Sequence, residues 1–173
     1  MKRTQMIFSL LLMAVLVSTG TASAEGKIGF VNLQRAVGES VVGKAAMADF
    51  QKDVAKIRTE IEAEQKQLES LKDEIERKSV VMNEDEKRKL IREFEDKQID
   101  FKRKVEETQV DLQARNQKIV SDLLQKLQQE ILKLGTSGGY AAILDSGTAQ
   151  VLYSDPASDV TDQVIKAFDA TNG

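Results

Sequence analysis

Apolar residues recur at alternating steps of four and three along the middle of this 173-residue chain. That alternation is the 3.5-residue period of a helical seam that packs against a partner helix. The first stripe with this spacing consists of Phe50, Val54, Ile57, Ile61, Glu64, Leu68, Leu71 and Ile75. Only one of its eight positions is polar. The pattern predicts a long helix that begins near Lys44 and continues through Arg77.

A second stripe with the same spacing predicts a second long helix, which runs back along the first. Its positions are Ile91, Phe94, Gln98, Phe101, Val105, Thr108, Leu112, Arg115 and Ile119. Three of them are polar, so this seam is the weaker one. From Ile119 to Leu134 apolar residues cover a wider face, which is typical of a helix end packed into a body. The two stripes predict a hairpin arm over residues 44–134.

The turn of this hairpin is predicted near residues 78–84. Val80, Val81 and Met82 interrupt the charged pattern, and β-branched residues weaken a helix. Asn83 then provides an N-cap, and Glu86 at the third helical position completes a capping box. The return helix is therefore predicted to start directly after Asn83.

Short strands are predicted at both ends of the chain. Residues 27–33 are apolar on both faces and predict a buried strand, and residues 34–43 are expected to form a connector. Residues 140–145 and 148–153 flank Ser146-Gly147 and predict a β-hairpin.

A last amphipathic helix is expected after Asp159, which provides a cap. The predicted fold class is therefore α+β, with a long antiparallel coiled-coil hairpin inserted into a small β-strand body. Residues 25–43 and 135–173 are expected to form this body. Because the body draws on both ends of the chain, the arm is an insertion into it.

The first 24 residues have the pattern of a secretory signal peptide. Lys2 and Arg3 precede a run of about twelve apolar residues, and Ala22-Ser23-Ala24 closes the segment. A membrane anchor is the alternative, but a bilayer span needs roughly 20 apolar residues. We therefore expect cleavage before Glu25 and an exported, soluble protein.

The amino-acid composition excludes several kinds of catalytic and binding site. The chain has no His, Cys or Trp, so it lacks the commonest general base and metal ligand, and it can form neither thiolates nor disulfides. Without Lys2 and Arg3 it carries 23 basic and 28 acidic side chains, a net charge of −5. This balance argues against nucleic acid as a partner. We expect no enzyme activity, no metal and no cofactor.

One segment is nearly a phosphate-binding loop. Residues 38–45, Gly-Glu-Ser-Val-Val-Gly-Lys-Ala, lie between the predicted strand and the first long helix. However, Ala45 stands where such a loop needs a hydroxyl group for Mg²⁺. We therefore interpret Gly38 and Gly43 as residues that let the chain turn into the arm, and keep a nucleotidase as a remote alternative.

Candidates for contact with a partner lie at the tip and on the weaker seam. Val80, Val81 and Met82 form the most exposed apolar run of the arm, and apolar exposure usually marks contact. Phe94 and Phe101 lie on a seam that is not tightly sealed, which favours loose contact with many sequences. The tip also gathers six basic side chains that suit an anionic membrane surface: Arg77, Lys78, Lys87, Arg88, Lys89 and Arg92.

Several segments resemble the Skp (OmpH) family of periplasmic chaperones for outer-membrane proteins. They are Lys27-Ile28-Gly29-Phe30-Val31-Asn32, Gly43-Lys44, Ala142-Ile143-Leu144-Asp145, Val151-Leu152-Tyr153-Ser154 and Asp159-Val160-Thr161-Asp162. The resemblance covers about residues 27–170. It implies a periplasmic, ATP-independent holdase that forms a homotrimer. Three helical arms would then surround a cavity that receives unfolded outer-membrane β-barrel proteins.

For the trimer body that the resemblance implies, we expect the apolar residues of the predicted strands to make the contacts: Ile28, Phe30, Val31, Ile143, Leu144, Val151 and Leu152. In one respect the chain departs from the family, whose familiar members are markedly basic, whereas this chain has a net charge of −5. Contact with clients would then rest on patchy apolar surface and short-range ion pairing. The alternative function is that of an exported structural adaptor, whose hairpin docks onto a single envelope partner.

Overall fold

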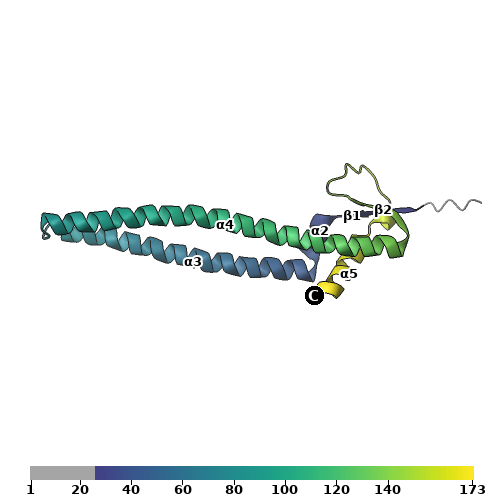
Figure 1. Cartoon of the computed structure of the whole chain (residues 1–173), viewed down its shortest axis with the longest axis horizontal. Coiled ribbons are helices and arrows are strands. Elements are labelled where there is room, and N and C mark those ends of the chain that lie inside the picture. Colours follow the sequence, from purple (N-terminus) through teal and green to yellow (C-terminus); the bar gives the residue numbers. More distant parts are fainter. Residues whose placement is uncertain (1–25) are drawn as a thin grey trace, which may run out of the picture.

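The computed structural model describes residues 26–173. Two long antiparallel helices, α3 (Val41–Lys78) and α4 (Glu84–Gly138), project from a small body at one end of the molecule (Figure 1). The predicted fold class, α+β with a long helical hairpin and a small sheet, is confirmed. The predicted signal peptide, residues 1–24, lies outside the described residues.

The body combines a two-stranded sheet with short helices. Strands β1 and β2 pair in parallel, with Ile28 opposite Ala142 and Phe30 opposite Leu144. The body elements are β1 (Lys27–Val31), α2 (Leu33–Glu39), β2 (Tyr140–Asp145), the 3₁₀ turn η1 (Pro156–Ser158) and α5 (Thr161–Asn172). The two strands are therefore separated in the chain by the entire arm.

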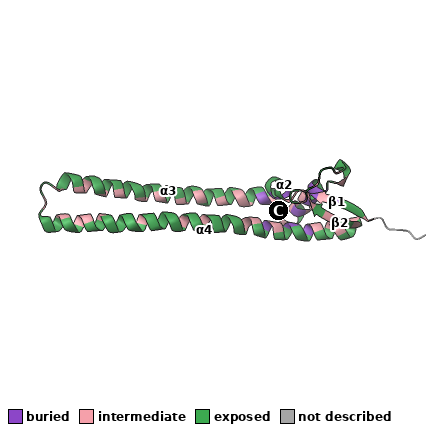
Figure 2. Ribbon diagram, turned by 90° about the horizontal axis from the view of Figure 1, so that it is seen from above, coloured by how far each residue is buried: buried purple, intermediate pink, exposed green. Residues whose placement is uncertain are grey.

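The hydrophobic core lies where the root of α4 meets both ends of the chain. Leu127 of α4 and Phe168 of α5 are fully buried. The other buried apolar residues are Val31, Ala36, Val37, Leu123, Val160 and Val164. Figure 2 shows that buried residues gather at the body end, whereas the arm is half-buried or exposed. The arm thus adds length without adding to the core.

The start of α3 is held by the last helix of the chain. The Asp169 carboxylate of α5 accepts hydrogen bonds from the backbone N–H groups of Val41 (3.0 Å) and Val42 (3.2 Å). Ser40 Oγ accepts a third from Gly43, at 3.0 Å. These bonds satisfy N–H groups that have no partner within the helix. A Cβ at Gly43 would lie 1.8 Å from the Val37 carbonyl oxygen, so this corner requires glycine.

The start of α4 matches the prediction. Asn83 Oδ1 accepts hydrogen bonds from Asp85 and Glu86, and the Glu86 carboxylate accepts one from the Asn83 N–H. This reciprocal pair is the predicted capping box. At its other end α4 stops at Gly139, whose φ of +67° is the left-handed conformation that glycine adopts without strain.

Two predictions about the body are wrong. Leu33, predicted as the last residue of the strand, and residues 34–39 of the expected connector form α2, and α3 begins at Val41 rather than near Lys44. Residues 148–153, including Val151 and Leu152, form no strand. The Asp145 carboxylate accepts hydrogen bonds from Gly147 N (3.0 Å) and Thr148 Oγ1 (2.9 Å), which produces a wider turn than a two-residue hairpin allows. The sheet forms between β2 and the distant β1 instead.

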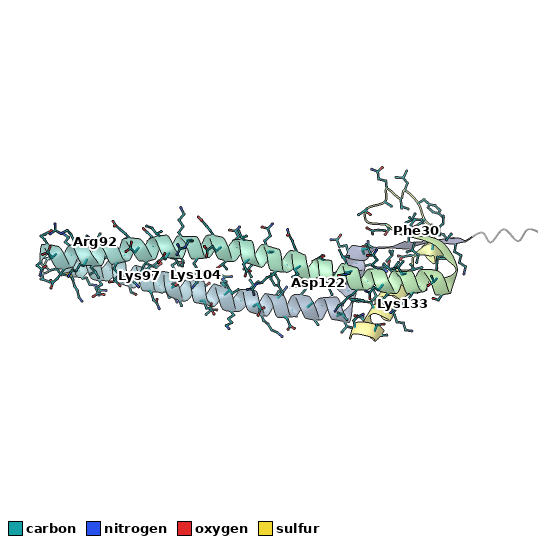
Figure 3. All side chains as sticks on the ribbon, in the orientation of Figure 1. Phe30, Arg92, Lys97, Lys104, Asp122 and Lys133 are labelled. Atoms are coloured by element: carbon teal, nitrogen blue, oxygen red, sulfur yellow. The ribbon has the colours of Figure 1, made fainter. Side chains whose placement is uncertain are left out.

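Charged side chains line the arm along its whole length, with Arg92 near the tip and Asp122 nearer the body (Figure 3). Among residues 26–173, no helix has a stretch that is long and apolar enough to cross a membrane.

Candidate functional site: the helical arm and the open face of the sheet

The seam between α3 and α4 is only partly closed. All eight predicted seam positions of α3 are half-buried, which confirms the heptad pattern. On α4 three of the nine predicted positions, Gln98, Val105 and Arg115, are exposed. The weaker second seam thus leaves side chains of the arm accessible.

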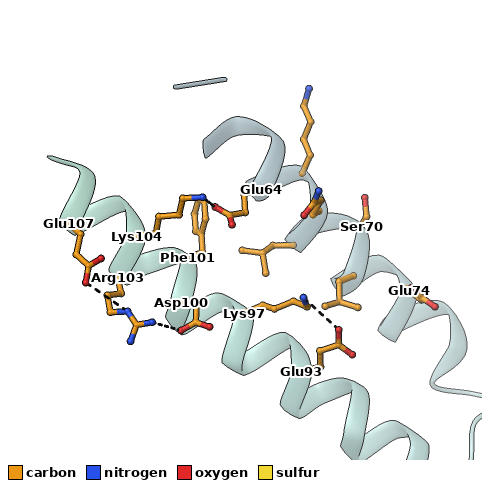
Figure 4. Close-up of a pocket in the computed structure, with 14 residues that line it drawn as sticks. Glu64, Ser70, Glu74, Glu93, Lys97, Asp100, Phe101, Arg103, Lys104 and Glu107 are labelled. Carbon is orange, nitrogen blue, oxygen red and sulfur yellow. Dashed lines mark hydrogen bonds and ion pairs between the residues drawn. The ribbon is translucent and has the colours of Figure 1, made fainter. Parts of the chain in front are cut away.

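A groove of about 750 Å³ opens between the two helices near the middle of the arm. Leu68, Leu71 and Phe101 provide its apolar lining, and charged side chains surround them (Figure 4). The predicted contact residue Phe101 therefore lies in a groove, where it is half-buried. Phe94, one heptad closer to the tip, is half-buried but does not line this groove.

The charged rim of the groove is internally paired. Lys104 Nζ lies 2.8 Å from the Glu64 carboxylate, the only ion pair within residues 26–173 that joins the two long helices. Arg103 pairs with Asp100 at 2.9 Å, and Lys97 lies 3.7 Å from Glu93 (Figure 4). Eight of the nine charged lining residues belong to ion pairs, and within residues 26–173 only Lys66 among them makes none. The charges around the apolar lining therefore largely offset one another.

The tip exposes the predicted apolar residues. Val80 and Val81, in the turn between α3 and α4, are 87% and 85% exposed. Met82, which follows them, is half-buried. Two neighbouring valines with this exposure form an apolar end to an otherwise charged arm.

The six basic residues of the tip differ in their pairing. Lys78 is paired with Glu74, and its ammonium group lowers the pKa of that carboxyl. Arg88 pairs with Asp85 at 2.7 Å. Within residues 26–173, Lys87 and Lys89 make no ion pair, and neither do Arg77 and Arg92, whose side chains donate to backbone carbonyls. The tip thus keeps unpaired positive charge beside its exposed valines.

One face of the sheet is open and apolar. Parallel pairing places Ile28, Phe30, Ala142 and Leu144 on the same face. Ile28 and Leu144 are 52% and 43% exposed, whereas Phe30 is half-buried. The opposite face carries Val31, which is buried in the core of its own chain, and Ile143, which is half-buried. The open face is the surface that a single chain leaves uncovered.

The remaining predicted body residues lie in the loop after β2. Leu152 is 101% exposed, with Tyr153 beside it also exposed, and Val151 is half-buried. An apolar side chain with no contacts in its own chain adds to the exposed apolar surface of the body end.

Comparison with known proteins identifies this architecture. A family model described as outer membrane protein (OmpH-like) matches residues 27–168. The chain belongs to the OmpH-like family. A solved structure of an OmpH-like outer membrane chaperone from Caulobacter crescentus CB15 is 26% identical in sequence, with a TM-score of 0.79. The match covers 84% of this chain and 85% of that one. No curated protein sequence matches the chain. Family and structure together support a chaperone role.

The segment that resembled a phosphate-binding loop has a different structure in this OmpH-like chain. Gly38 and Glu39 belong to α2, Lys44 and Ala45 belong to α3, and the two helices meet at Ser40. The segment therefore lacks the loop of consecutive free N–H groups that holds a phosphate. Residues 26–173 also contain no cluster of three or more acidic side chains arranged to hold a metal ion.

A network that the sequence did not indicate joins β1, α2 and α5. Thr161 Oγ1 accepts a hydrogen bond from Asn32 N at 2.9 Å, and the Asp159 carboxylate accepts one from Thr161 N at 2.8 Å. Arg35 reaches Asp162 at 2.6 Å. Partial burial raises the pKa of Asp159, but hydrogen bonds from Thr161 and the charge of Arg35 outweigh this effect, and the pKa is lowered below 3.8.

We predict that acid weakens the body of this OmpH-like chain through Asp159. A lowered folded-state pKa contributes stability that is present above the unfolded-state value of 3.8 and is lost as pH falls through the folded-state value. The free energy of unfolding should therefore decline below pH 3.8, and less steeply in Asp159→Asn. Urea unfolding from pH 5 to pH 2.5, followed by circular dichroism, measures both slopes. Identical slopes would contradict the prediction.

Proposed function

We propose that this chain is an ATP-independent periplasmic holdase, which binds unfolded outer-membrane β-barrel proteins between helical arms and prevents their aggregation. The proposal adds the compartment, the client class and the independence from ATP to the chaperone role that the family supports. It includes export by residues 1–24, no cofactor and no catalysed reaction. Val80, Val81, Met82, Phe94 and Phe101 are the proposed client contacts.

The observation that carries this proposal is the combination of apolar patches and self-paired charges on a long arm. The groove at Phe101 is lined by leucines and rimmed by charges most of which already have partners. The exposed valines of the tip form a second patch. Such separated, shallow patches favour weak contacts with many sequences, because no single patch encloses enough of a ligand to select one.

A single arm cannot surround a client, so we propose that three copies assemble through the open face of the sheet. The exposed side chains of Ile28 and Leu144 support this step, as does Leu152 in the loop after β2. Exposed apolar patches of this kind are typical of protein–protein contact. The assignment of residues 25–43 and 135–173 to a trimerisation body remains a prediction.

We expect Leu144→Lys combined with Ile28→Lys to break this assembly. Each introduced charge would be buried without a partner at the interface, which costs far more than its exposure in a free chain. Sedimentation velocity should then show one chain where the unsubstituted protein shows three. Ile99→Lys is a matched control, since Ile99 is a similarly exposed apolar residue on the arm. Three chains in the double variant would contradict the proposal.

The holdase function can be tested without any nucleotide. A urea-unfolded outer-membrane β-barrel protein is diluted into buffer that contains residues 25–173, and light scattering is followed. We expect scattering to be suppressed, with saturation near three chains per client. Unchanged scattering at a tenfold excess of chains would refute the proposal.

A structural adaptor is the second candidate, favoured by the compact patch of Val80 and Val81 at the tip. An adaptor would bind one folded partner at a fixed stoichiometry, and substitution of these valines would remove all binding. The unpaired basic residues beside them also support weak contact of the tip with an anionic membrane surface. Sedimentation with vesicles that contain anionic phospholipid, compared with neutral vesicles, tests that contact.

A further inference from the structure

The half of α4 that lies nearer the body segregates its charges. Between Thr108 and Leu132 every charged residue falls on one stripe with steps of three and four residues. The stripe consists of Asp111, Arg115, Lys118, Asp122, Lys126 and Glu130. Its charges pair along the helix, with Arg115 2.7 Å from Asp111 and Lys118 3.2 Å from Asp122. Charge is therefore confined to one side of this half of the helix.

Another side of the same half-helix is free of charge over five turns. We name it the neutral track, and it comprises Val110, Ala114, Gln117, Ser121, Gln125 and Gln128. All six residues are exposed, and at 1.5 Å per residue the track is about 27 Å long. Closer to the tip the same side of α4 carries Asp96, Arg103 and Glu106. On α4 the absence of charge from this side is thus limited to the half of the helix nearer the body, in a chain with 31% charged residues.

The neutral track faces away from α3. The seam residues Leu112 and Ile119, which are half-buried, each stand two residues from a track position, and two residues are about 200° around a helix. Helix α3 therefore does not cover the track. Helix α3 carries an exposed, uncharged stripe of its own, formed by Ala48, Gln51, Ala55, Thr59 and Ala63. The neutral track is therefore distinguished by its position beside a groove as well as by its lack of charge.

The track leads into a groove of about 680 Å³ between α4 and the sheet. Ser121, Gln125 and Gln128 belong to both the track and the groove, and Val31 and Ile143 line the opposite wall. Asp145 is the only charged residue of this groove, and its carboxylate accepts hydrogen bonds from Gly147 and Thr148. Partial burial raises the pKa of Asp145, but these hydrogen bonds favour its ionised form and outweigh burial, so the pKa is lowered. The surface is thus uncharged from Val110 through Gln128 and meets a single negative charge at the sheet.

The chemistry of the track matches an extended, uncharged polypeptide. Glutamine amides and the serine hydroxyl both donate and accept hydrogen bonds, as peptide groups do, and so can pair with a backbone whatever its sequence. Val110 and Ala114 add small apolar surface. A length of about 27 Å corresponds to about eight residues of extended chain. The transmembrane strands of β-barrel proteins have segments of about this length, with apolar residues at every second position and few charges among them.

We propose that the neutral track is the docking surface for extended, uncharged strand segments of an unfolded β-barrel client. The proposal rests on the holdase function and adds a client contact, on the half of α4 nearer the body, to those proposed at the tip and at Phe101. A charge placed on the track would be covered by the client without a partner, and so would weaken holding whatever its sign.

The test compares charges of both signs on the track with the same change elsewhere. Ala114→Glu/Gln117→Glu and Ala114→Lys/Gln117→Lys should each raise the chain concentration needed for half-maximal suppression of scattering about tenfold. Gln51→Glu/Ala55→Glu is the matched control, since Gln51 and Ala55 lie on the exposed, uncharged stripe of α3, whose residues line neither groove. Its charge change is identical to that of the Glu variant on the track. A photo-crosslinking residue at position 117 should capture the unfolded β-barrel client, and one at position 51 should not.

Each outcome has a separate meaning. If the unsubstituted chain fails to suppress scattering, the holdase function is wrong. If it suppresses scattering and both track variants do so equally well, or if only one sign of charge weakens holding, the neutral track is wrong. If the track variants dissociate into single chains in sedimentation, the track is a contact between copies and the client assignment is overturned. If a variant fails to fold, crosslinking at position 117 is the test: capture of the client supports the neutral track, and no capture overturns it.

Discussion

A chain without residues 52–116, closed by a four-residue Gly-Ser linker, is expected to keep its body and lose most of its suppression of client aggregation. The core residues Val31, Leu127 and Phe168 lie outside the deletion. Packed helices are 8–10 Å apart, so a short loop can join the shortened α3 and α4. The deletion removes the tip, the groove at Phe101 and the outer end of the neutral track. Light scattering with an unfolded β-barrel client measures the loss.

The control for this deletion is to show that the body still folds and assembles. Sedimentation should give the same number of chains per particle as the full-length protein, and circular dichroism should show a cooperative thermal transition. A deletion that suppressed scattering as well as the full-length chain would refute the assignment of client contact to the arms. If the long deletion does not fold, a shorter one over residues 65–103 joins the ion-paired positions Glu64 and Lys104. It removes the tip and the groove at Phe101 but keeps the neutral track, so it should weaken the suppression of scattering without abolishing it.

Phe168→Ala is expected to cause the largest loss of stability of any single substitution. Phe168 is fully buried, and only eight apolar residues form the buried core within residues 26–173. Removing a buried phenylalanine side chain typically costs about 3–5 kcal/mol, a large share of the 5–15 kcal/mol that usually separates folded and unfolded states. Urea unfolding at one fixed chain concentration measures the change, because dissociation of copies would otherwise contribute.

Phe94→Ala provides the comparison, since Phe94 is a half-buried seam residue of the arm. Its loss should be clearly smaller, because part of its surface already contacts water in the folded chain. Equal losses for the two variants would contradict the account of a small core that carries the stability of the molecule.

The arm was predictable because its signals are local. Heptad spacing over residues 50–75 gave positions that are all half-buried, and Asn83 with Glu86 forms the expected capping box. A helical period and a cap depend on residues three or four apart, so a single segment of sequence contains the whole pattern.

The body was harder to predict because its contacts join the two ends of the chain. The partner of β2 is β1, more than a hundred residues away, rather than the adjacent segment that contains Leu152. Likewise Asp169 caps α3 from the last helix. Neither contact leaves a local pattern, and the turn at Ser146-Gly147 favoured the wrong strand partner.

The candidate site was predictable only in part, because some of its features are local in sequence and others depend on contacts between distant residues. The exposure of Val80 and Val81 followed from an apolar run at a charged tip. The groove at Phe101 required the register of the two helices, which places Lys104 against Glu64. The confinement of charge to one side of α4 is visible in the sequence, but it has meaning only once α3 and the sheet are placed around the helix.

The composition of the complex with a client tests the central claim most directly. An outer-membrane β-barrel protein is diluted from urea into an excess of residues 25–173, and the mass of the resulting particle is measured by native mass spectrometry. The account predicts three chains with one unfolded client and no nucleotide. A particle of chains alone, or one that forms only with a folded partner, would contradict it.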